Sequence, residues 1–165
     1  MGAFQSTAPV LQRVHHIWLS LPRPAPGAPP PRSAFDPALL APRDLRFIVL
    51  LDVVGGPAPE TLDFVYRLVG TGVVEALGLE FTGLRLSEHL DEHDTPRLMA
   101  DYRAAVESRG PQLFRGALQR VGKDWLGYER IALPLTDETG ERIVAILGAV
   151  AFDRVDRIGA DNQAL

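Results

Sequence analysis

The stretch from Arg46 to Val69, RFIVLLDVVGGPAPETLDFVYRLV, decides which class of fold the chain adopts. Its first part, RFIVLLDVV, is rich in β-branched and apolar residues, which is typical of a strand, and Gly-Gly-Pro at 55–57 ends that strand. The second part, LDFVYRLV, alternates with a period of two. The alternation places a set of apolar and aromatic residues on one face: Leu62, Phe64, Tyr66 and Leu68. We therefore predict two strands that pair antiparallel.

Downstream of this hairpin, the sequence predicts short helices, one longer helix and three more strands. Gly70-Thr71-Gly72 leads into an apolar stretch that ends at Gly78, where a left-handed helix cap is expected. Asp94-Thr95-Pro96 is a typical helix start, and we expect this helix to continue to about Ser108. The later strands are expected at residues 112–121, 125–135 and 142–152, with turns at 122–124 and 137–140.

Two strands, a group of helices and three further strands make an α+β domain. We expect one five-stranded antiparallel sheet with the helices packed on one face, because a lone two-stranded hairpin would be only marginally stable. Such a sheet curves around its helices and can leave a cavity between the two layers. The domain is expected to span residues 35–153, and a polar tail follows at 154–165.

The first 34 residues are expected to form a helix and a proline-rich linker. Residues 8–21 place a set of apolar side chains at helical spacing: Val10, Val14, Ile17, Trp18 and Leu21. Residues 22–32 contain six prolines, which remove backbone donors and fix φ, so this stretch is expected to be extended and solvated. The alternative is a proline-rich ligand for the aromatic groove of a partner protein. Asp36 and Pro37 then open a short helix as its N-cap and first residue.

Composition excludes several classes of protein. The 165-residue chain carries 17 basic and 21 acidic side chains, so no basic excess points to nucleic acid or to an anionic membrane surface. The absence of cysteine excludes a disulfide scaffold, a cysteine-ligated metal site and a thiol nucleophile. The longest nearly apolar run, Ile143 to Phe152, is about half as long as the roughly 20 residues that span a bilayer. No signal sequence is recognised, and we expect a cytoplasmic protein.

Four short segments together resemble a known family. FDP (35–37), LLDV (50–53), FVYRLVGT (64–71) and FTG (81–83) are similar to segments of a bacterial family of short, stand-alone PAS-like proteins. The order of elements over residues 44–153, about two thirds of the chain, also resembles that of a PAS domain. The resemblance implies a domain that binds a small ligand or cofactor, transmits a signal and dimerises, often through a helix that precedes the first strand.

Candidate ligand-binding residues lie on the elements that should frame the cavity. They are amphipathic or charged, and they comprise Tyr66, Tyr102, Trp125, Tyr128 and Arg130. Tyrosine and tryptophan offer an apolar ring and one hydrogen-bonding group, and an inward-pointing arginine can hold a carboxylate with two hydrogen bonds. The alternative is that these side chains simply pack the core and its rim.

The residues identify no cofactor and no catalytic centre. Some PAS domains hold haem through a histidine, and the i, i+4 spacing of His89 and His93 also suits a metal site. Both histidines, however, lie in EHLDEHD (88–94), a strongly polar stretch that is typical of a solvated turn. Covalent flavin photochemistry needs a cysteine, which the chain lacks. No hydrolase, nucleotide-binding or metalloprotease motif occurs, so we expect that the protein is not an enzyme.

These observations predict a sensory or ligand-binding PAS-like domain. Only twelve residues follow residue 153, so we expect the signal to leave through a signalling partner protein or through self-association. The apolar face Val10, Val14, Ile17, Trp18 and Leu21 is the expected contact surface of a homodimer. The alternative is a ligand-free interaction adaptor with a solid core. An enclosed volume of roughly 300 Å³ or more would favour a small organic ligand, and a filled core would favour the adaptor.

Overall fold

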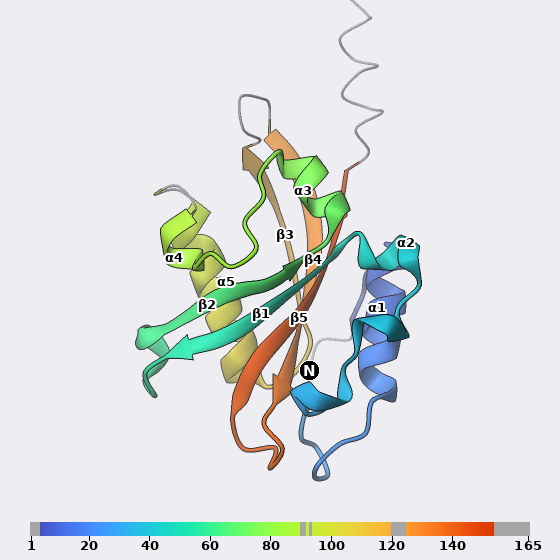
Figure 1. Cartoon of the computed structure of the whole chain (residues 1–165), viewed down its shortest axis with the longest axis vertical. Coiled ribbons are helices and arrows are strands. Elements are labelled where there is room, and N and C mark those ends of the chain that lie inside the picture. Colours follow the sequence, from blue (N-terminus) through green and yellow to red (C-terminus); the bar gives the residue numbers. More distant parts are fainter. Residues whose placement is uncertain (1–3, 90–91, 93, 120–124, 154–165) are drawn as a thin grey trace, which may run out of the picture.

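The computed structural model describes residues 4–89, 92, 94–119 and 125–153. Five strands form one sheet in the spatial order β2-β1-β5-β4-β3, and each neighbouring pair is antiparallel (Figure 1). Their bounds are β1 (Ile48–Gly55), β2 (Leu62–Val69), β3 (Gln112–Gln119), β4 (Trp125–Thr136) and β5 (Ile143–Phe152). The first and last thirds of the domain therefore meet where β1 pairs with β5, and the predicted fold class is confirmed. The turn predicted at 122–124 and the tail at 154–165 lie outside the described residues.

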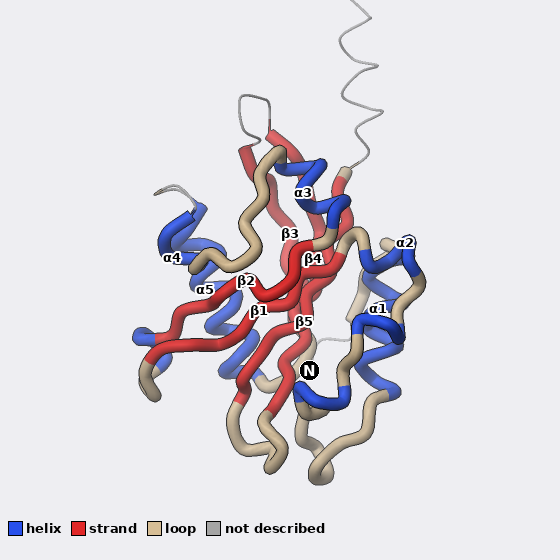
Figure 2. The backbone as a smooth tube through the Cα atoms, in the orientation of Figure 1, coloured by secondary structure: helices blue, strands red, loops and turns tan. Residues whose placement is uncertain are grey.

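Three helices cover one face of the sheet (Figures 1 and 2). They are α3 (Thr71–Leu77), α4 (Leu86–His89) and α5 (Asp94–Ser108). The left-handed cap predicted at Gly78 is present, with φ of 72°, and α5 has the predicted bounds. α5 buries one stripe of side chains at helical spacing: Leu98, Met99, Tyr102 and Ala105. This stripe packs on Leu51, Phe64 and other inward residues of the sheet to form the first of two cores.

The N-terminal helix α1 (Pro9–Ser20) covers the opposite face of the same sheet, beside the short α2 (Pro42–Leu45) (Figure 1). The ring nitrogen Nε1 of Trp18 donates to the carbonyl oxygen of Pro134 at 2.9 Å. Val14, Trp18 and Leu21 are buried against the sheet of their own chain, and this packing forms the second core. The sequence did not specify whether this helix packs on its own sheet or on that of a neighbouring chain. In the structure it packs on its own sheet.

Part of the proline-rich stretch is packed rather than solvated. Pro29 and Pro30 are buried, and hydrogen bonds from Thr136 hold them against β4. The backbone N–H of Thr136 donates to the carbonyl oxygen of Pro30 at 2.9 Å, and the hydroxyl of Thr136 donates to the carbonyl oxygen of Pro29. The prediction of a solvated linker is therefore wrong at this end of the stretch. Three 3-10 turns complete the described chain: Arg32–Ala34, Pro37–Leu39 and Pro59–Thr61. The second has the predicted cap, since the Asp36 carboxylate accepts from the N–H of Ala38.

A β-bulge in β2 changes the predicted pattern of faces. Leu50 lies opposite Leu68, but the next residue of β1, Leu51, lies opposite Tyr66, so Arg67 has no partner in the pairing. Beyond this extra residue the alternation is inverted, and Leu68 packs with the α1 core while Tyr66 packs with the α5 core. The prediction that Leu68 shares a face with Phe64 and Tyr66 is therefore wrong. Tyr66 is therefore the last residue of β2 before the bulge, and its side chain points towards α5.

Candidate functional site

A small cavity lies between the sheet and the helices of the α5 face. Four of the five predicted ligand-binding residues line it: Tyr66 from β2, Tyr102 from α5, and Tyr128 and Arg130 from β4. Its volume is about 50 Å³, and its remaining walls are apolar: Val49, Val73, Leu77, Phe81, Leu98, Val150 and Phe152. The side chain of the fifth residue, Trp125, lies outside the described residues. The sequence thus located the cavity but not its size.

Arg130 is the polar centre of this cavity. The alternation of β4 points Tyr128, Arg130 and Ala132 towards α5, while Ile131 and Leu133 point to the other core. Arg130 is 5% exposed, and its Nη2 donates to the Asp101 carboxylate of α5 at 2.5 Å. Its guanidinium carbon lies 4.7 Å from the ring centroid of Tyr102 and 4.8 Å from that of Phe114. Aromatic rings on two sides therefore hold the cation in place.

The guanidinium has hydrogen-bonding capacity to spare. Two of its buried nitrogens, Nε and Nη1, make no hydrogen bond of ordinary geometry with the residues that the structure describes, although the phenols of Tyr102 and Tyr128 lie close enough to interact with the guanidinium. A buried donor without an acceptor costs about 1–3 kcal/mol, and more when the group is charged. A cation with free N–H groups beside a cavity is the chemistry that binds a carboxylate or another oxyanion.

Burial and charge fix the protonation of this cluster. Burial raises the pKa of Tyr66 well above its ordinary value of 10.0, and it also raises the pKa of Tyr102. Burial on its own would lower the pKa of the Arg130 guanidinium, but its interactions with Tyr102, Tyr128 and Asp101 outweigh burial, so the pKa is raised. At neutral pH Tyr66 and Tyr102 are therefore neutral phenols beside one guanidinium cation.

Asp101 and Phe114 belong to this cluster, although the sequence analysis did not single them out. Asp101 precedes Tyr102 and lies at the margin of the apolar stripe of α5, where its side chain is 22% exposed. The sequence does contain a signal for Asp101. It is an acidic residue beside the apolar stripe, and an inward-pointing arginine needs a compensating charge. Phe114 gave no such signal, since one aromatic residue on an edge strand is common.

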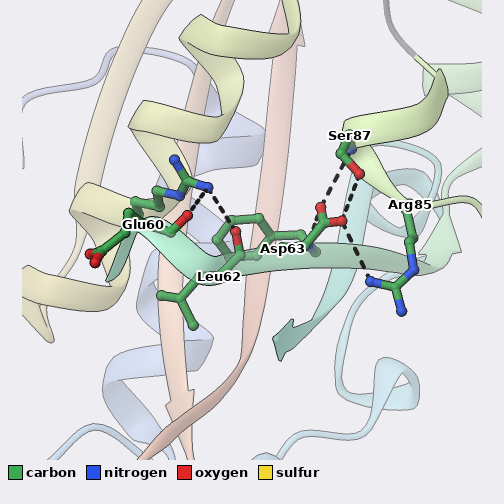
Figure 3. A network of polar contacts seen from close by, with 7 residues as sticks. Glu60, Leu62, Asp63, Arg85 and Ser87 are labelled. Carbon is green, nitrogen blue, oxygen red and sulfur yellow. Dashed lines mark hydrogen bonds and ion pairs between the residues drawn. The ribbon is translucent and has the colours of Figure 1, made fainter. Parts of the chain in front are cut away.

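A second polar network holds α4 and α5 against β2 (Figure 3). The carboxylate of Asp63 accepts from the hydroxyl of Ser87 at 2.6 Å and from Arg85 at 3.5 Å, at the start of α4. Nη2 of Arg103, from α5, donates to the carbonyl oxygens of Glu60 and Leu62, both at 3.0 Å. α4 and α5 are therefore tied to the same strand that supplies Tyr66.

The remaining predicted residues do not contribute to this cavity. Val14, Trp18 and Leu21 are buried in the other core, so they are not the exposed contact surface that the sequence predicted. Val10 and Ile17 are half-buried at the margin of that core. The side chain of His89 and all of His93 lie outside the described residues.

Two absences in the described part of the chain concern metal ions and membranes. Within it, no group of three or more histidine, aspartate or glutamate side chains is arranged to hold a metal ion. None of its helices combines the length and the apolar character that a membrane span requires.

Comparison with known proteins gives the fold. No protein-family model matches the chain, and no curated protein matches its sequence. Among solved structures, the PAS domain of a protein from Colwellia psychrerythraea is similar, with 18% identity and a TM-score of 0.51 over 67% of this chain and 87% of that chain. The LOV protein of Rhodobacter sphaeroides has 15% identity and a TM-score of 0.49, over 72% of this chain and 64% of that chain. The PAS domain of BvgS from Bordetella pertussis has 16% identity and a TM-score of 0.44, over 72% and 83%. With its strand order and the Colwellia likeness together, the chain has the fold of a PAS domain.

Proposed function

We propose that the protein is a sensory PAS-like domain that binds a small anion at Arg130. The observation that carries this proposal is the buried Arg130 guanidinium, which lines a cavity and has two nitrogens, Nε and Nη1, that make no hydrogen bond of ordinary geometry in the described chain. The neutral phenols around it add groups that can donate hydrogen bonds to the same anion. We propose a binding function, and we assign no catalytic role to any residue of the cluster.

The volume of the cavity limits the ligand class. About 50 Å³ holds a few water molecules or one ion of similar size, whereas drug-sized ligands occupy roughly 300 Å³ or more. The proposed ligand is therefore an oxyanion as small as formate, acetate or nitrate. A larger organic ligand would have to displace the apolar wall that α3 and α5 supply.

The Arg130–Asp101 ion pair supplies a route for the signal. It joins β4 to α5, and an anion on the free nitrogens of Arg130 would weaken the attraction of the guanidinium for Asp101. Binding would then change how firmly α5 is held on the sheet. We propose that a signalling partner or a second copy of this chain responds to that change.

The proposal is tested by titrating formate, acetate and nitrate into ¹⁵N-labelled protein at constant ionic strength, with chloride as the reference. We expect saturable shifts in the amide signals of α5 and β4 in the wild type and in Arg115→Gln. Arg115 is an exposed arginine of β3 that pairs with Glu129 and serves as the matched control. Arg130→Gln should abolish the shifts. Equal responses of the two variants, or no saturable response in the wild type, would contradict anion binding.

A ligand-free interaction adaptor is the second candidate, and the small size of the cavity favours it. Arg130 would then serve only to join the sheet to α5 through Asp101 and the aromatic rings of Tyr102 and Phe114. Native mass spectrometry of the purified protein separates the two candidates. A mass without adduct, together with no response to any of the three anions, supports the adaptor.

A further inference from the structure

A surface groove of about 340 Å³ lies on the other side of the sheet from the Arg130 cavity. One wall comes from α1, with Gln12, Arg13, His16 and Ile17. The other comes from the segment 39–44 that leads through α2 towards β1. The proposed function does not use this groove, because none of its lining residues contributes to the cavity at Arg130.

The floor of the groove is apolar, and part of it is open to solvent. Ile17, Leu39 and Leu40 line it, and Leu39 is 49% exposed although leucine is a large apolar residue. The position of Leu39 is fixed by the preceding turn, because its N–H donates to the carbonyl of Asp36 at 2.9 Å. The groove has the size of ordinary small-molecule sites, and like them it exposes mainly apolar surface, with polar side chains around it.

The rim of the groove carries a positive charge. The Asp44 carboxylate is 3% exposed, and Arg13 neutralises it with hydrogen bonds from Nε at 2.8 Å and from Nη2 at 2.6 Å. Arg43 is exposed and makes no ion pair with any residue that the structure describes. The one acidic residue of the groove is thus already paired, and a free cation remains at its edge.

We propose that this groove binds an anionic amphiphile, a molecule with a medium-length apolar chain and a carboxylate head. The chain would lie along Ile17, Leu39 and Leu40, and the carboxylate would accept hydrogen bonds from Arg43. Charge complementarity selects this class over a neutral or cationic amphiphile, because among the described residues the guanidinium of Arg43 has no ion-pair partner and the one carboxylate of the groove is paired. The site lies on the α1 side of the sheet and does not depend on ligand binding at Arg130.

The test is a calorimetric titration of the full chain with decanoate, decanol and decyltrimethylammonium, each below the concentration at which it aggregates. We expect decanoate to bind best. Arg43→Glu should weaken decanoate binding by about tenfold or more, the loss expected when one charge-assisted hydrogen bond is removed, and should strengthen binding of the cationic amphiphile. Leu39→Asp should weaken binding of decanoate and decanol, because it places a carboxylate in the apolar floor.

Two matched variants separate the groove from general surface binding. Arg142→Glu changes another exposed arginine, in the loop before β5, and Leu84→Asp changes another exposed leucine, which is 43% exposed. Both variants should bind decanoate as the wild type does. Equal affinity for decanoate and decanol, or equal losses in the groove and matched variants, would overturn the proposal. Binding of an acidic amphipathic peptide without any binding of decanoate would also overturn it, in favour of a protein partner.

Discussion

Arg130 on β4 and Asp101 on α5 form an ion pair whose two ends differ in exposure. The side chain of Arg130 is 6% exposed, whereas that of Asp101 is 22% exposed. The cation is therefore held inside the domain, and its counter-charge lies at the boundary with solvent. This unequal burial makes the arginine depend on the aspartate more than the reverse, because a buried charge without compensation is unfavourable.

Removing the carboxylate should destabilise the domain. Asp101→Ala leaves a buried guanidinium uncompensated, which costs about 3–5 kcal/mol in fully buried pairs, and we expect the lower end because Asp101 is partly exposed. Urea unfolding measures this change. The double variant Asp101→Ala/Arg130→Met should recover much of the lost free energy of unfolding, since an apolar side chain needs no counter-charge. A double variant no more stable than Asp101→Ala would contradict this account.

Truncating Trp18 should release α1 from the sheet. The indole is 4% exposed and donates to the carbonyl of Pro134, so Trp18→Ala removes a large buried ring and one hydrogen bond. We expect a loss of about 3–5 kcal/mol in the free energy of unfolding. Leu19→Ala is the control, because Leu19 lies on the same helix but is 54% exposed, and its change should stay within about 0.5 kcal/mol. Similar losses for both variants would show that α1 does not pack in this orientation.

Gly70 should tolerate no side chain. A Cβ at this position would lie 2.3 Å from the carbonyl oxygen of Arg46, because the chain between β2 and α3 passes directly against the residues before β1. Gly70→Ala must displace backbone, and we expect a destabilisation of about 1–3 kcal/mol. Gly110→Ala serves as the control, since the nearest atom to its added Cβ would be 3.8 Å away. Thermal unfolding of the two variants measures the difference, and equal midpoints would refute the close approach.

The Asp63 network should make stability depend on acid pH. Burial alone would raise the pKa of Asp63, but hydrogen bonds from Ser87, from the N–H of Phe64 and from Arg85 outweigh it and hold the pKa below 3.8. The stabilisation is therefore complete above the unfolded-state pKa, near 3.8, and is lost as the pH falls through the lower pKa of the folded state.

Urea unfolding of Asp63→Asn and of the wild type at pH 7 and at pH 3 or below measures this dependence. We expect Asp63→Asn to have a lower free energy of unfolding than the wild type at pH 7, and we expect this difference to become smaller in acid. Glu138→Gln, which alters an exposed carboxylate in the hairpin loop, should match the wild type at both values. A gap for Asp63→Asn that is independent of pH would mean that the carboxylate charge plays no part.

The candidate site was predictable in its members but not in its dimensions. Tyr66, Tyr102, Tyr128 and Arg130 could be assigned to the cavity because strand period and helix stripe decide which way a side chain points. The volume of about 50 Å³ depends on how the rings of Tyr66 and Phe81 pack edge to face across the layers, with centroids 4.6 Å apart. Packing of this kind joins residues from separate elements, and no local pattern specifies it.

Local sequence patterns were enough to specify the elements and the class of fold. The signals that specified them are local, and each acts within a few residues. They are the period-two alternation, the helix start at Asp94-Thr95-Pro96, and the positive φ of Gly78 and Gly140. Local patterns did not specify which face of the sheet α1 covers, nor that Leu68 points away from the face of Tyr66. Both outcomes follow from contacts between distant segments. The bulge at Arg67 inverts every later residue of β2, and the sheet face that includes Ile48, Leu50 and Leu147 needs an apolar cover, which α1 provides.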